Sequence, residues 1–143
     1  MNAAADALDR ALAAEYAAIF GYGVAGAHLV GDDRVTARQA ESAHRARRDA
    51  LLVRLSTANA SPPAADPAYA LPFPVTDRTS ALKLTTQLED ASARVWYAAL
   101  ASTSGDDRSL SANALVDCAV RATRWRRIAG VAPETLTFPG TAA

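Results

Sequence analysis

The sequence predicts an all-α protein, a four-helix bundle in a single domain. Alanine and larger apolar residues recur at three- and four-residue steps along four long stretches, which is the period of amphipathic helices. Turn signals near Asp32 and at Ser104-Gly105-Asp106 join these stretches into two pairs, and a proline-rich segment separates the pairs. A chain of 143 residues is long enough for one domain around one core.

The first pair of helices is expected over residues 3–30 and 34–58. Gly31 is the expected C-cap of the first helix, and Asp32 or Asp33 the expected N-cap of the second. The second helix should turn Leu51, Leu52 and Leu55 inward. The inward stripe of the first helix is expected to contain Leu8, Leu12, Glu15, Ile19, Tyr22, Gly26 and Val30.

Residues 59–76 contain five prolines, a density that no helix tolerates. Tyr69, Leu71, Phe73 and Val75 alternate there with small residues and prolines, which predicts an extended segment lying on the bundle. Such a segment reaches up to about 59 Å, whereas a 27-residue helix is about 40 Å long. The crossover can therefore run the length of the bundle, which predicts up-down-down-up topology.

The second pair of helices is expected over residues 78–102 and 107–129, with Thr76 or Asp77 as the first cap. Gly130 should end the last helix, and Thr135 to Gly140 should form a short extended tail. The inward residues are expected to be Leu82, Leu84, Leu88, Val95, Trp96 and Leu100, followed by Leu110, Leu115, Val120, Trp125 and Ile128.

Composition excludes several classes of function. The formal net charge is zero, so electrostatic capture of nucleic acid or of an anionic membrane is not expected. Cys118 is the only cysteine, which rules out an intramolecular disulfide and Cys-based zinc sites. Because neither a signal-peptide pattern nor an apolar run of about 18 residues is present, the expected location is the cytoplasm. The alanine-rich helix surfaces predict a homodimer or another protein partner.

The stretches AEYAAIFGYGVAGAHL, AHRARRDALL, YALPFPVTD, QLED and TFPG resemble the ferritin-like superfamily, in particular an uncharacterised actinobacterial family of small ferritin-like domains. In metal-binding ferritin-like proteins, glutamates on helices 1 and 3 and Glu-x-x-His motifs on helices 2 and 4 hold two iron or manganese ions. The resemblance assigns Glu15 and Glu89 to the first and third positions and Glu41 with His44 to the second. Helix 4 has no such motif, and Asp117 is its only inward carboxylate candidate.

The depth of these residues in the bundle favours a different pairing. With the first turn centred near Asp32, the residue level with Glu15 is about residue 49, and Glu41 lies about 12 Å away from that level. The residues at the right depth are Arg48 opposite Glu15 and Arg121 opposite Glu89. Because a guanidinium group can fill a ligand pocket with fixed positive charge, we expect Glu15–Arg48 and Glu89–Arg121 pairs in place of a metal site.

Two classes of function follow from these residues. The first is a non-enzymatic scaffold or interaction protein without a cofactor, in which Glu41 and His44 are solvated or capping residues. The alternative is a carboxylate-based iron- or manganese-binding protein with redox or iron-handling activity. Its ligands would be Glu15, Glu41, His44, Glu89 and Asp117. No catalytic residue is predicted, because the sequence contains no nucleophile triad, phosphate loop or dinucleotide fingerprint.

Overall fold

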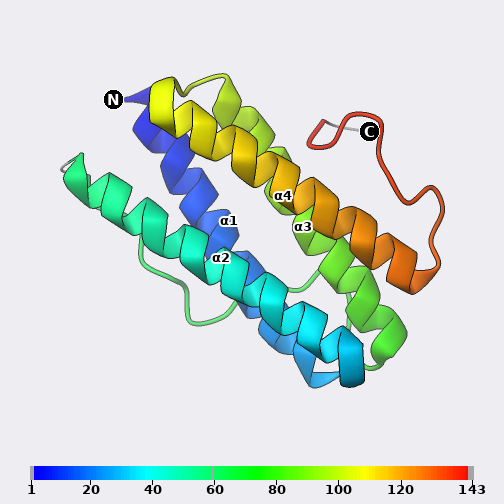
Figure 1. Ribbon diagram of the computed structural model, residues 1–143. Helices are drawn as coiled ribbons and strands as arrows, with labels where there is room; N and C mark the ends of the chain where they lie inside the picture. The colour runs from blue at the N-terminus through cyan, green and yellow to red at the C-terminus, as the bar shows by residue number, and fades with distance from the viewer. Residues whose placement is uncertain (1, 59, 142–143) are drawn as a thin grey trace.

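A computed structural model of the chain describes residues 2–58 and 60–141 and shows four helices (Figure 1). Helix α1 spans Ala3–Ala27, α2 spans Gly31–Thr57, α3 spans Arg78–Leu100 and α4 spans Gly105–Ala129. The described residues form no strand. The all-α, four-helix fold predicted from the sequence is therefore confirmed.

The four helices run up, down, down and up (Figure 1). Short turns make α2 antiparallel to α1 and α4 antiparallel to α3, and the crossover between α2 and α3 returns the chain along the bundle. Helix α1 packs against both α2 and α3, and α3 also packs against α4. No helix in the described part of the chain has the length and apolar character that a membrane span requires.

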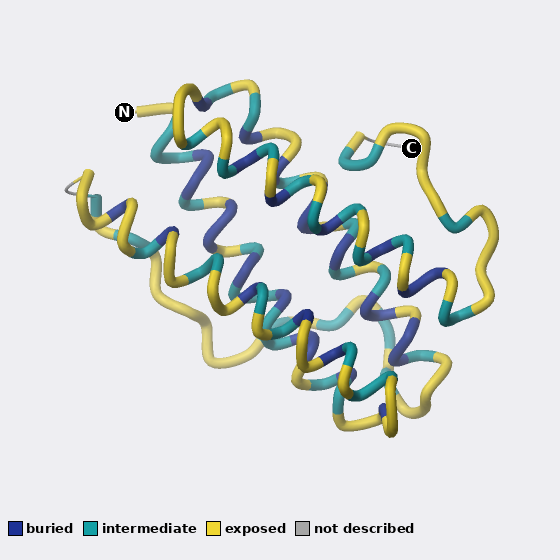
Figure 2. Tube along the Cα trace, in the orientation of Figure 1, coloured by how far each residue is buried: buried dark blue, intermediate teal, exposed yellow. Residues whose placement is uncertain are grey.

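The buried residues of each helix lie on the side that faces the other helices (Figure 2). Among them are two apolar clusters. The first cluster includes Leu8, Leu12, Leu51, Leu55 and Trp96. The second cluster includes Tyr22, Leu29, Leu82, Leu84 and Trp125. Burial of these side chains is the main source of stability for the fold. The clusters occupy opposite halves of the bundle and leave its middle to other residues.

The turn between α1 and α2 lies three residues earlier than the sequence predicted. Helix α1 ends at Ala27, not at residue 30, and the turn buries Leu29. Gly31 is not the C-cap of α1; it begins α2 with a φ of +55°, a conformation that favours glycine. The N-cap of α2 is Val30, and neither Asp32 nor Asp33 occupies that position as expected. Val30 was also expected to point inward, but it is 72% exposed.

The second hairpin follows the prediction at its start and departs from it in α4. Asp77 caps α3 through a capping box with Ser80, as one of the two expected caps. Val120 was expected inward but is 53% exposed. From Leu110 to Trp125 the expected stripe advanced by five residues at a time, and each such step rotates about 140° around a helix and leaves the core face. The buried residues of α4 recur instead at three- and four-residue steps and include Ser111, Ala114, Cys118, Ala122 and Trp125.

The crossover and the tail both lie on the bundle. Leu71, Phe73 and Val75 pack against the second apolar cluster, as their alternation predicted. The ring of Tyr69 lies 5.6 Å from that of Phe20 on α1, measured between centroids. The C-terminal tail bends back over the α3–α4 hairpin and does not extend away from it (Figure 1).

Candidate functional site

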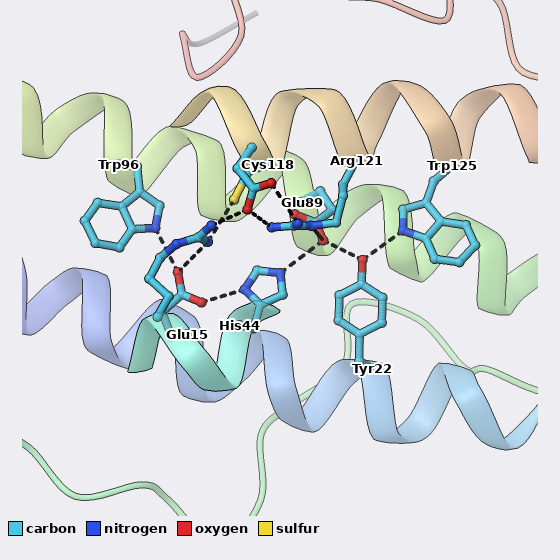
Figure 3. A network of polar contacts seen from close by, with 10 residues as sticks. Glu15, Tyr22, His44, Glu89, Trp96, Cys118, Arg121 and Trp125 are labelled. Atoms are coloured by element: carbon cyan, nitrogen blue, oxygen red, sulfur yellow. Dashed lines mark hydrogen bonds and ion pairs between the residues drawn. The ribbon is translucent and has the colours of Figure 1, made fainter. Parts of the chain in front are cut away.

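A network of charged and aromatic side chains fills the middle of the bundle, between the two apolar clusters (Figure 3). Its central residues are Glu15 on α1, His44 on α2 and Glu89 on α3, and none of them exposes any surface. Each of these three residues lies at the middle of its helix, where the inward face is furthest from solvent. Charged groups so placed are costly unless they are paired and hydrogen-bonded.

His44 joins the two glutamates. Its Nδ1 lies 2.5 Å from Glu15 Oε2 and its Nε2 lies 3.0 Å from Glu89 Oε1. Because carboxylates only accept, both contacts are hydrogen bonds when the imidazole is protonated and donates from both nitrogens. Burial opposes that charge, but the hydrogen bonds and charges of the two glutamates outweigh it and raise the pKa of His44 from 6.5 to about 9. At neutral pH His44 is therefore an imidazolium.

Glu15 has two further donors. Arg47 Nη1 donates to Glu15 Oε1 at 3.2 Å, and Trp96 Nε1 donates to the same oxygen at 2.8 Å. The Arg47 guanidinium also lies 5.9 Å from the ring centroid of Trp96, within the range of a cation–π contact. Side chains from α1, α2 and α3 are thus fixed around one carboxylate.

Glu89 receives a matching set of donors. Tyr22 OH donates to Glu89 Oε1 at 2.5 Å and accepts from Trp125 Nε1 at 2.8 Å, and Arg121 Nε donates to Oε1 at 3.1 Å. Burial acts to raise the pKa of Glu89, but the hydrogen bond and charge of His44, with help from Arg121, lower it below 4.5. Burial, the Glu89 charge and its hydrogen bond raise the pKa of Tyr22 well above 10, so its hydroxyl remains a donor.

Asp117 closes the network on the side where α2 faces α4. It bonds to both arginines, Arg47 and Arg121, and its side chain is 43% exposed. Burial acts to raise the pKa of Asp117, but the neighbouring guanidinium groups, Arg121 foremost, outweigh it and lower that pKa below its usual value. Three carboxylates, of Glu15, Glu89 and Asp117, therefore balance three cations, of His44, Arg47 and Arg121. Charge balance allows the whole group to stay in a low-dielectric core.

The aromatic donors follow a register that is visible in the sequence. Tyr22 lies seven residues after Glu15 on α1, and Trp96 lies seven residues after Glu89 on α3. Because α1 and α3 are antiparallel, each glutamate comes level with the aromatic residue of the other helix. Sequence reasoning treated these aromatics as plain core residues. The repeated Glu-x6-aromatic spacing was the signal that could have identified them.

The structure brings together some of the residues proposed from the sequence and separates others. Arg121 lies at Glu89, but the arginine at Glu15 is Arg47 and not Arg48, which pairs with its neighbour Asp49. With the turn centred at Leu29, the residue of α2 at the same depth in the bundle as Glu15 is residue 43, whereas a turn at Asp32 would make it residue 49. His44 is one position away from residue 43 and therefore lies next to Glu15. His44 is consequently a buried residue and not the solvated or capping residue that we expected.

Glu41 lies outside the network. It pairs with Arg45 on the outer side of α2 at 2.7 Å, and both side chains are partly exposed. Four of the five ligands considered for a metal, Glu15, His44, Glu89 and Asp117, thus belong to one network, but Glu41 does not reach it.

The geometry of the network does not fit a metal ion. Both nitrogens of His44 and both oxygens of Glu15 are engaged by other groups of the network. Glu89 Oε2 is a buried oxygen without a hydrogen-bond partner among the described residues, and one oxygen is too few to hold a cation. Within residues 2–58 and 60–141, no three His, Cys, Asp or Glu side chains are arranged as a metal site. Two guanidinium groups also supply positive charge where a cation would lie.

Comparison with known proteins places this bundle in a family. The chain belongs to the family described as domain of unknown function DUF4439, whose model matches residues 7–143. It is similar to a solved protein, described as a conserved hypothetical protein, rv2844, from Mycobacterium tuberculosis. The two chains are 36% identical with a TM-score of 0.85, and the match covers 88% of this chain and 96% of the other. No curated protein matches the chain. The ferritin-like relationship is not tested by these comparisons and stays a prediction.

Proposed function

We propose that this protein is a metal-free helical scaffold or interaction protein, in which a charge-balanced network takes the place of the di-metal site of ferritin-like proteins. The observation that carries the proposal is the position of His44. Its two nitrogens bond to the two glutamates that would otherwise be the primary metal ligands. The imidazolium and two guanidinium groups thereby supply the positive charge that metal ions would supply.

The burial of the reactive groups supports a non-catalytic role. Glu15, His44 and Glu89 have no exposed surface, so a substrate could not contact them without separating the helices. Cys118 is also buried, and burial, with the charge of Glu89 adding to it, raises the pKa of its thiol. Because the thiolate is the nucleophilic form, this cysteine is unreactive in the folded protein.

Metal binding is the test that separates this proposal from the iron- or manganese-handling alternative. Protein purified without chelator is assayed for metals by mass spectrometry and then titrated anaerobically with Fe(II) and with Mn(II) in a calorimeter. We expect no metal above background, no heat of binding at micromolar metal and no change in Tm. A ligand that bound the native state would raise Tm with its concentration.

A matched pair of variants makes the negative result informative. Glu15→Ala removes a central carboxylate, and Glu41→Ala removes one outside the network. Near-stoichiometric iron or manganese in the natural protein, lost in Glu15→Ala and kept in Glu41→Ala, would overturn the proposal in favour of the metalloprotein. Binding lost only in Glu41→Ala would locate a metal site outside the network; it would overturn the metal-free part of the proposal but not the assignment of the charge-balanced core.

A further inference from the structure

The C-terminal tail forms an arch over the α3–α4 hairpin. Near its start, Glu134 pairs with Arg127 of α4 at 3.0 Å. Near its end, Gly140 has a φ of +83° and lies so close to the hairpin that a Cβ there would be 2.6 Å from Tyr97 Cβ and 2.7 Å from the Ala93 carbonyl oxygen. Both ends are thus fixed, and the residues between them span a cavity.

The cavity beneath this arch is aliphatic and has a volume of about 330 Å³. Its walls include Leu115, Val116 and Val120 from α4 and Leu136 and Pro139 from the tail, and no aromatic residue is among the described residues that line it. Val116 and Val120 are 61% and 53% exposed, so they gain little burial from the protein itself. A methylene group is similar in size to a water molecule, about 30 Å³, so the cavity accommodates a chain of about ten carbons.

One end of the cavity is positively charged. Asp90 and Arg126, which pair with each other, line this cavity and also a neighbouring cavity of about 620 Å³. Lys83 and Arg94 line the second cavity as well, so its lining has three cations and one carboxylate; the Lys83 ammonium also lies 4.6 Å from the centroid of the Phe73 ring. Arg94 is exposed and makes no ion pair with the described residues. An apolar slot that opens beside an excess of positive charge is complementary to an aliphatic anion.

We propose that this groove binds a single-chain aliphatic carboxylate of about ten carbons. The chain occupies the cavity under the tail, and the carboxylate lies in the second cavity near Arg94, Arg126 and Lys83. A guanidinium group is the preferred partner of a carboxylate because of its paired donors. This site is separate from the core network, and it goes beyond the proposed role as a scaffold.

Decanoate is the probe for this inference, measured by calorimetry and by ¹H–¹⁵N chemical-shift mapping on the whole chain. We expect saturable one-to-one binding with a dissociation constant of about 100 μM. Shifts should be confined to residues 115–126 and 131–141 and to the outer face of α3. Nonyltrimethylammonium, with the same nine-carbon alkyl chain and a cationic head, should bind about tenfold more weakly because the head would face like charges.

Four surface variants complete the design. Arg94→Gln removes a charge at the proposed head site and Val120→Gln makes the aliphatic wall polar, and each should weaken decanoate binding about fivefold. Arg10→Gln on α1 and Val53→Gln on α2 are the matched controls and should bind as the natural protein does. All four positions are exposed on helices, so the fold is retained.

Three results would overturn the inference. The first is no saturable binding of decanoate below millimolar concentration. The second is equal binding of the anionic and cationic probes, or equal binding by all four variants. The third is concentration-dependent shifts in the groove without any ligand, which would make this face an interface between copies of the chain.

Discussion

His44 is the residue on which the centre of this protein depends. It spans the distance between two buried glutamates from different helices, and it does so with both ring nitrogens. A neutral imidazole could donate to only one of them and would leave the other carboxylate facing a lone pair. The charge state of a single side chain therefore sets the electrostatic balance of the whole core.

Stability should depend on pH through His44. Its pKa is about 9 in the folded protein and near 6.5 in the unfolded chain, so its contribution is complete below pH 6.5 and is lost as the pH rises through 9. The free energy of unfolding should fall by about 3 kcal/mol across that window. The measurement is urea unfolding at intervals between pH 6 and 10.

Two histidine variants control the pH experiment. His28→Gln, at an exposed histidine, should keep the dependence. His44→Gln should flatten it below about pH 8.5 at a lower overall stability; above that pH the buried thiol of Cys118, whose pKa is raised, adds a fall of its own. Nitrogen-15 shifts of His44 should show both nitrogens protonated at pH 7. An unfolding free energy that stays constant from pH 6.5 to 9 would contradict the assigned imidazolium.

Glu89→Gln should strongly destabilise the protein. Glu89 Oε1 accepts from Tyr22, His44 and Arg121, and removal of its charge leaves the three cations of the network facing only two carboxylates. Loss of one member of a buried ion pair costs about 3–5 kcal/mol, which chemical denaturation would measure. Glu41→Gln is the control and should change stability by about 0.5 kcal/mol or less, because its pair is on the surface. Similar losses in the two variants would show that burial does not set the cost.

Helices α1 and α3 are built to the same plan at the scale of the element. Each carries an inward glutamate and, two turns later, an inward aromatic residue whose N–H or O–H points to the glutamate of the other helix. Residues seven apart lie nearly on one face of a helix, so the plan needs no distortion of the backbone. The antiparallel packing of two such helices produces both hydrogen bonds together.

Two glycine substitutions should act in opposite directions. Gly23 lies within α1, and a Cβ added there would meet no atom within 4 Å, so Gly23→Ala should raise stability by about 1 kcal/mol through helix propensity. Gly140→Ala places a methyl group against backbone at positive φ and should cost at least about 1 kcal/mol in docking the tail. Urea unfolding measures the first, and backbone ¹⁵N relaxation of residues 131–141 measures the second. Unchanged relaxation in Gly140→Ala would contradict a tight anchor.

The whole molecule has two apolar clusters joined by a polar middle. A buried network of ion pairs adds little net stability compared with apolar packing, but it fixes which partners meet. Every helix contributes at least one side chain to it, so neither hairpin can satisfy its charged groups alone. We therefore expect the two hairpins to be stable only together.

Unfolding should accordingly be a single cooperative transition. Trp96 lies in the first cluster and Trp125 in the second, so Trp125→Phe and Trp96→Phe each leave one fluorescent reporter in a different half. In each variant the fluorescence and far-ultraviolet circular dichroism transitions in urea should coincide, as for a two-state domain. A transition of either tryptophan that precedes the loss of helix would indicate halves that unfold separately.

The sequence alone determined the four helices, the crossover, their up-down-down-up order and the inward position of Glu15 and Glu89. These features depend on local periodicity and on proline, which act over a few residues at a time. Only the tertiary structure decided which cations meet the glutamates. When the turn between two antiparallel helices moves by three residues, the residue that lies opposite a given position moves by six. The residue of α2 opposite Glu15 is therefore residue 43, next to His44, and not residue 49. One residue of helix also rotates a side chain by about 100°, which is why Arg47 points into the core and Arg48 does not.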